Sequence, residues 1–209
     1  MGQEEVKDVE SRIVEAAKQV FIRKGFEAAT MGDIALEAGI GRTSLNYYFR
    51  TKEMLFDAIL GKLMNMILPN VNQIVESESS YPEKVKKIIS LYLQTIRENE
   101  LIPLFVVNEL QRDPQHLFHA VLKDPERIAP ILKLQQFVNN EMEKGNIRKM
   151  PIVDLVSTFI SLVIFPFLIK TPLTTIFLNG NEDEFDAFLD RRVELVYGII
   201  EHLLKPENK

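Results

Sequence analysis

The sequence contains no cysteine, which excludes disulfides, thiolate metal sites and cysteine nucleophiles. Residues 1–5 form no basic leader and no apolar run follows them, so we expect no signal peptide. The longest uncharged apolar stretch, residues 155–169, has 15 residues, whereas a membrane helix needs roughly 20. These absences predict a cytoplasmic protein without a membrane span, in which that stretch is buried.

Motifs of catalysis and metal binding are also missing: we find no glycine-rich phosphate loop, nucleophile elbow or zincin spacing. His116 and His119 are three residues apart, with Asp113 and Asp124 nearby, and could hold a metal from one helix. Prolines on both sides indicate a short surface connection instead, and His202 has no partner in sequence. We therefore expect no enzyme activity, no metal site and no cofactor.

The net charge of −5 is unusual for a protein that binds nucleic acid, but its distribution is uneven. Residues 1–52 hold eight basic and eight acidic residues, so the whole excess of negative charge lies in the rest of the chain. Within residues 38–52 there are Arg42, Arg50 and Lys52 and no acidic residue. This local positive charge is a modest footprint for phosphate contacts.

Periodic apolar residues predict an all-α fold of about nine helices and no strand. The first helix covers residues 11–24 and ends at Gly25, and the second runs from a capping box of Thr30 and Asp33 to Gly39. The other predicted helices cover residues 42–49, 52–68 up to Pro69, 83–98, 101–111, 126–144, 152–168 and 184–204.

The second and third helices have the pattern of a helix-turn-helix. Such a motif needs a small residue at the helix crossing, a turn residue that tolerates unusual backbone angles, and an apolar anchor. Ala35, Gly39 and Leu45 meet these needs, and Leu45 and Phe49 are expected in the core. The third helix then enters the major groove by its N-terminal end. Its outward residues are Arg42, Thr43, Asn46 and Tyr47.

These side chains suit DNA. Arg42 can form a bidentate pair with guanine, Asn46 can do so with adenine, and Thr43 can touch base edges. Side chains suited to phosphates are those of Tyr47, Tyr48, Lys52 and, at a helix N-terminus, Thr30. Each of them alone is more often a core or solvated residue, but their combination after a helix and a turn indicates DNA binding.

The segment from Thr30 to Leu55 closely resembles the DNA-binding signature of the TetR family of bacterial transcriptional regulators. The motifs that carry the resemblance are Asp33-Ile34-Ala35, Ala38-Gly39-Ile40, Leu45-Asn46-Tyr47-Tyr48-Phe49 and Lys52-Glu53-Met54-Leu55. It covers the first quarter to third of the chain, and Asn46 stands where many members have tyrosine. The contacts that it implies are Arg42, Thr43, Tyr47 and Tyr48 from the recognition helix, with Thr30 and Lys52 to the DNA backbone.

The resemblance also implies the overall organisation. Residues 1–52 form the helix-turn-helix domain, and residues 53–209 form an antiparallel helical bundle for ligand sensing and dimerisation. A homodimer paired through helices 152–168 and 184–204 would bind a palindromic operator in double-stranded DNA as a ligand-responsive repressor. The dimer residues that we predict are Phe159, Val163, Phe188, Val193, Val196, Tyr197 and Ile200.

The effector is expected to be a largely apolar small molecule. The predicted ligand-binding residues are Phe105, Asn108, Glu109, Phe159 and Phe165. A satisfied hydrogen-bond network in the core would explain the polar ones equally well. The alternative to a regulator is a helical adaptor that binds another protein and not specific DNA, and it would show no steep salt dependence of duplex binding.

Overall fold

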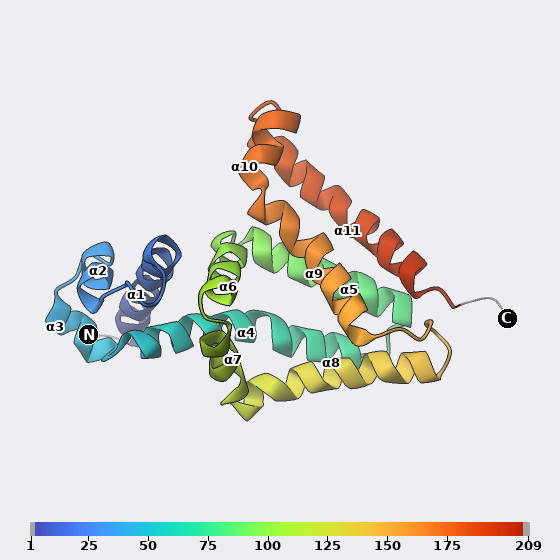
Figure 1. Ribbon diagram of the computed structural model, residues 1–209, viewed down its shortest axis with the longest axis horizontal. Coiled ribbons are helices and arrows are strands. Elements are labelled where there is room, and N and C mark those ends of the chain that lie inside the picture. Colours follow the sequence, from blue (N-terminus) through green and yellow to red (C-terminus); the bar gives the residue numbers. More distant parts are fainter. Residues whose placement is uncertain (1–2, 207–209) are drawn as a thin grey trace. The chain divides into compact units, whose positions relative to one another are not determined.

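The computed structural model describes residues 3–206, with side chains from Asp8 onward, and no strand occurs in that range (Figure 1). The predicted all-α fold is confirmed. In chain order the elements are α1 (Gln3–Lys24), α2 (Met31–Glu37), α3 (Arg42–Tyr48), α4 (Lys52–Glu76), α5 (Tyr81–Arg97), α6 (Leu101–Arg112), α7 (Pro114–Leu122), α8 (Pro125–Glu143), α9 (Ile152–Leu168), α10 (Lys170–Pro172), the π-helix η1 (Leu173–Phe177) and α11 (Glu182–Leu204).

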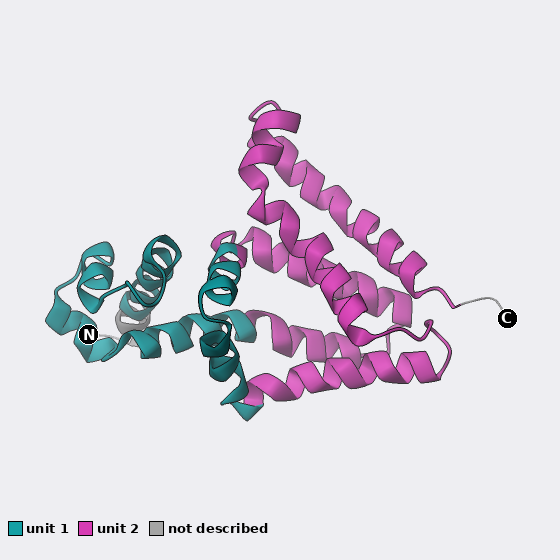
Figure 2. Cartoon of the chain, viewed as in Figure 1, with its two compact units in different colours: residues 1–65, 104–125 teal, residues 66–103, 126–209 magenta. Residues whose placement is uncertain are grey.

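The chain forms two compact units, shown in Figure 2. Unit 1 comprises residues 1–65 and 104–125, and unit 2 comprises residues 66–103 and 126–209. The chain therefore passes from one unit to the other three times, within α4, within α6 and at the start of α8. This grouping by packing differs from the predicted boundary at residue 52, which divides the chain by function and stays a prediction.

Unit 1 contains the three N-terminal helices, and local signals set their ends. Thr30 accepts a hydrogen bond from the main-chain N–H of Asp33 at 3.1 Å, and the Asp33 carboxylate accepts one from the N–H of Thr30, which completes the predicted capping box. Gly25 and Gly39 have φ angles of 79° and 65°, a conformation that favours glycine at the end of a helix. The fully buried side chains of this core are Ile13, Ala17, Val20, Phe21, Ile34, Leu45, Leu55 and Phe56.

The fourth helix is longer than predicted. We expected it to stop at Pro69, but α4 continues to Glu76 with the proline inside it. Proline removes one main-chain hydrogen bond, and the Asn70 amide donates to the main-chain oxygen of Met66 at 2.9 Å in the same turn. Val71, which follows directly, is 1% exposed. Burial beyond the proline outweighs the local cost, so the predicted end was wrong.

Residues 114–122 also differ from the prediction, because they form helix α7 and not a short surface connection. Asp113 is the N-cap and accepts from the N–H of His116 at 3.0 Å, and Pro114 occupies the first turn. Asp-Pro is a favourable start of a helix. Leu117 and Ala120 are buried, so α7 packs into the core of unit 1.

Unit 2 is built mainly from α5, α9 and α11, which pack on one another (Figure 1). Asn181 caps α11 by accepting from two main-chain N–H groups. Pro166 lies near the end of α9, and the chain bends by 65° between α9 and the α10–η1 segment. By length and composition, α4 could cross a membrane, and so could α9 with α10 and η1 if that bent pair is one span, but core helices meet the same criterion. The fully buried side chains of unit 2 include Ile89, Val163, Phe185 and Val196.

Candidate nucleic-acid interface

One face of α3 is exposed to solvent. Its other face is anchored by Leu45, which is completely buried, and by Phe49 directly after the helix, which is 6% exposed. Because residues four apart lie on the same side of a helix, burial of these two turns the opposite side outward. The exposed polar side chains of the helix are those of Arg42, Thr43, Ser44, Asn46 and Tyr47. They include the four residues that the sequence predicts to face DNA.

The two tyrosines of α3 are placed differently. Tyr47 is 82% exposed, and its ring meets that of Tyr48 edge-on with centroids 5.2 Å apart. Tyr48 is half-buried and packs against the core of unit 1. Arg42 makes no hydrogen bond or ion pair with any residue that the structure describes. Arg42 and Tyr47 are therefore both exposed polar groups of the helix.

The two predicted backbone contacts outside α3 already have partners in the protein. The Thr30 hydroxyl donates to Asp33 at 2.8 Å. The Lys52 ammonium donates to the main-chain oxygens of Phe26 and Glu27 at 2.9 and 3.0 Å. Both side chains therefore hold the turn between α1 and α2 in this structure.

Helix α6 contacts the end of α1 through polar side chains that the sequence analysis assigned to a ligand pocket or did not single out. The Asn108 amide donates to the main-chain oxygen of Ile22 at 3.5 Å, and the Arg112 guanidinium donates to that of Phe21 at 3.4 Å. Arg112 also covers Gly25, where an added Cβ would lie 2.0 Å from its Nη1 atom. The absence of a side chain at Gly25 thus allows α6 to approach α1.

Glu109 lies in the same contact and is 1% exposed. Burial raises the pKa of its carboxyl, and the Arg112 charge and a hydrogen bond from the N–H of Phe26 oppose that shift. Its Oε1 atom has no hydrogen-bond partner among the described residues. Phe105, one turn earlier, is also 1% exposed and packs on Phe56 with ring centroids 5.4 Å apart.

The predicted ligand-binding residues are thus divided between the units. Phe105, Asn108 and Glu109 belong to unit 1. In unit 2, the ring of Phe159 meets that of Tyr92 edge-on at 5.2 Å, and Phe165 is 55% exposed. Neither unit by itself assembles the five residues, and the pocket stays a prediction.

The residues predicted for the dimer interface point in different directions. Val163, Val196 and Ile200 lie in the core of unit 2 and are at most 2% exposed, so they pack within their own chain. Half-buried are Phe159, Phe188, Val193 and Tyr197. Other apolar residues of α9 and α11 that are exposed include Val153, Val156, Ile160, Leu195 and Ile199. Apolar residues occupy most of α9, so helical spacing did not separate its exposed side from its buried side.

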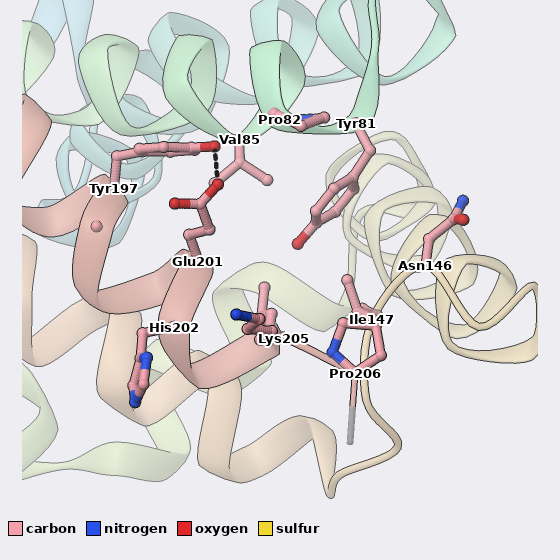
Figure 3. A pocket seen from close by; sticks show the side chains of 12 residues that line it. Tyr81, Pro82, Val85, Asn146, Ile147, Tyr197, Glu201, His202, Lys205 and Pro206 are labelled. Atoms are coloured by element: carbon pink, nitrogen blue, oxygen red, sulfur yellow. Dashed lines mark hydrogen bonds between the residues drawn. The ribbon is translucent and has the colours of Figure 1, made fainter. Parts of the chain in front are cut away.

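Unit 2 also has a pocket of about 550 Å³ between the start of α5, the segment after α8 and the end of α11 (Figure 3). Tyr197 donates to Glu201 across 2.7 Å, which raises the pKa of Tyr197 to about 12. The Tyr81 hydroxyl is buried without a partner among residues 8–206, and burial raises its pKa. Of the predicted ligand-binding residues, none lines this pocket.

Comparisons with known proteins agree with the geometry of α2 and α3. Residues 13–59 match the family model described as bacterial regulatory proteins of the tetR family. The transcriptional repressor KstR2 of Mycobacterium tuberculosis is 26% identical over 148 residues, which cover 71% of this chain and 74% of that protein. The transcriptional regulator UidR of Escherichia coli is 27% identical over 149 residues, covering 69% and 72%.

The fold extends the match to nearly the whole chain. A putative fatty acid metabolism regulator of Clostridium perfringens aligns over 94% of this chain and all of that one, with a TM-score of 0.74 and 21% identity. At that identity the likeness shows the fold alone. The matched model and the curated relatives identify residues 13–59 as a DNA-binding domain of the TetR type, as in transcriptional regulators, and the fold of the whole chain agrees with it.

Proposed function

We propose that the protein is a ligand-responsive repressor that binds a palindromic operator as a homodimer in the cytoplasm. The observation that carries the proposal is the exposure of Arg42, Thr43, Asn46 and Tyr47 on α3, which is anchored in the core by Leu45. Arg42 reads guanine, Asn46 reads adenine and does not bind a phosphate, and Thr43 touches base edges. Tyr47 and Tyr48 bind phosphates, and so does the N-terminus of α2 at Thr30.

The dimer is supported by the apolar side chains that unit 2 leaves exposed. Val153, Val156 and Ile160 follow one side of α9, and Leu195 and Ile199 follow one side of α11. Because α9 and α11 pack on each other, the same two helices of a second copy would complete a four-helix bundle. Two-fold symmetry of that bundle presents two copies of α3 to two half-sites of the operator.

The effector in this proposal is a largely apolar small molecule that changes the spacing of the two recognition helices. A broad thermal-shift screen tests it, because the effector should raise the melting temperature and weaken operator binding together. A screen in which no compound changes both properties would contradict control by a ligand. It would not bear on the proposal that the protein binds an operator.

Operator binding is tested by selecting sequences from a random duplex DNA pool with the purified protein at near-physiological salt. We expect a palindrome to be enriched, with half-sites about one helical turn apart. Failure of the folded protein to enrich any sequence would overturn the proposal and favour a helical adaptor.

A further inference from the structure

Lys52 is the first residue of α4 and is half-buried. Its ammonium donates to the main-chain oxygens of Phe26 and Glu27, at 2.9 and 3.0 Å, and lies 4.5 Å from the centroid of the Phe26 ring. Two of its three N–H donors are used in this way. A hydrogen bond to a phosphate that pulled the ammonium away would break both of these bonds and the contact with the ring.

The Phe26 ring, which the Lys52 ammonium covers, is buried and packs against a second ring. Phe26 is 7% exposed, and His116 of α7 lies against it with ring centroids 4.2 Å apart and an angle of 34° between the planes. Lys52 and His116 thus both lie within 4.5 Å of the Phe26 centroid. His116 also packs on Phe56 of α4, with centroids 4.3 Å apart. The main-chain oxygen of Phe26 that Lys52 binds therefore belongs to a residue of the packed core of unit 1.

Only three residues, Phe49 to Thr51, separate α3 from α4. A side chain that fixes the first residue of α4 therefore also limits how far the end of α3 can move. Arg42 is the contrasting cation, because it is exposed on α3 and makes no hydrogen bond or ion pair within the described part of the chain.

From these contacts we propose that Lys52 is a positioning residue, which holds the recognition helix against the turn between α1 and α2 and does not bind a phosphate of the operator. This differs from the backbone contact that the family resemblance implies for Lys52. The inference rests on the proposed binding of an operator by α3. The two candidate roles of Lys52 differ in how operator affinity depends on salt and in what happens to the protein without DNA.

The test uses the full chain, the selected operator and three variants. Lys52→Met removes the ammonium and keeps an unbranched apolar stem, Phe26→Leu removes the ring and leaves every charge in place, and Arg42→Met is the matched loss of an exposed cation. Operator affinity is measured over a series of salt concentrations. Amide hydrogen exchange of residues 42–48 is measured in the protein without DNA, after thermal unfolding has shown that each variant is folded.

We expect Lys52→Met and Phe26→Leu to weaken operator binding by about tenfold, with the dependence of log affinity on log salt close to that of the unchanged protein. Both should speed amide exchange in α3 in the absence of DNA. Arg42→Met, which removes a base contact, should weaken binding to the preferred operator and leave exchange unchanged.

The positioning role is overturned if Lys52→Met reduces the salt slope by about 0.9 while exchange in α3 stays as in the unchanged protein. Should Lys52→Met not fold, Phe26→Leu decides the question alone, since unchanged affinity and unchanged exchange in that variant would also contradict the role. Absence of operator binding by the unchanged protein contradicts the proposed function, and the exchange measurements still test the positioning of α3.

Discussion

Among the side chains of α3, that of Arg42 is expected to contribute most to recognition of the DNA base sequence. Its guanidinium is exposed at the start of α3, where a recognition helix enters the groove. We expect Arg42→Ala to cost about 1–3 kcal/mol on the preferred operator and to relax the preference for guanine at one position of each half-site. Competition binding against operators substituted at single positions measures both effects.

The matched control is Arg191→Ala, which removes an exposed arginine from α11 in unit 2. It should change neither affinity nor base preference. Equal losses for the two variants would mean that Arg42 contributes only general positive charge, and base reading would then have to come from Asn46 and Thr43.

Glu109 gives a prediction about stability and pH. Because burial raises the pKa of its carboxyl, the folded protein holds that proton more tightly than the unfolded chain does. Stability from this residue is therefore complete below the unfolded pKa and is lost as pH rises toward the folded pKa. Glu109→Gln removes the charge and keeps the shape, so it should raise the free energy of unfolding at pH 7 by about 1 kcal/mol.

Denaturant unfolding of Glu109→Gln and the unchanged protein at several pH values checks this expectation. The stability gain should shrink toward acid pH, where the native carboxyl is also neutral. Glu126→Gln, on α8, is the comparison that removes an acidic charge outside the contact between α6 and α1. A gain for Glu109→Gln that is independent of pH would show that the buried charge is not its source.

At the scale of single helices, the seven residues of α2 depend strongly on their cap. Both partners of the capping box are present at Thr30 and Asp33, and loss of an N-cap hydroxyl costs about 1 kcal/mol. We expect Thr30→Ala to lower the free energy of unfolding by that amount and to weaken operator binding, because α2 supports α3. Chemical unfolding and operator affinity are both measured.

Ser80→Ala is the control for the cap, since Ser80 forms the same capping box with Glu83 at the start of α5 in unit 2. It should cost a similar amount of stability without changing operator affinity. If both variants weaken operator binding equally, general stability and not the position of α2 explains the loss.

Sequence patterns identified most helices of this chain because their signals are local. The cap at Thr30 and the glycines at 25 and 39 act within one turn, and the structure has them as predicted. The errors occur where contacts between residues far apart in the sequence determine whether a helix forms and where it ends. Pro69 is tolerated inside α4 because residues beyond it are buried, and α7 forms where Leu117 and Ala120 reach the core of unit 1.

For the molecule as a whole, the predicted site residues also divide into those placed by local signals and those placed by contacts between distant segments. The outward residues of α3 follow from the burial of Leu45 and from helical spacing, so the sequence was sufficient to place them. The buried positions of Phe105 and Glu109 depend on how α6 meets α1, which no local pattern encodes. Along α9 nearly every residue is apolar, so periodicity could not separate the side that faces the chain's own core from the exposed side.

The exposed side of α9 and α11 gives the prediction for the assembly. Ile160 is 45% exposed and Ile199 is 40% exposed, while Leu132 on α8 is 55% exposed in the same unit. If α9 and α11 form the dimer interface, Ile160→Glu and Ile199→Glu should each bury an unpaired charge between the subunits, at a cost of several kcal/mol. We expect monomers in analytical ultracentrifugation and weak operator binding for both.

Leu132→Glu separates this effect from the general consequence of a new surface charge, because it introduces the same carboxylate at an apolar position outside the two helices. It should remain dimeric with unchanged affinity. A monomeric Ile160→Glu that still binds a single half-site, with the base preference of the intact protein, would show that each unit 1 reads DNA independently and that the dimer supplies affinity through two linked contacts. Dimers that persist in both isoleucine variants would place the interface elsewhere on the chain.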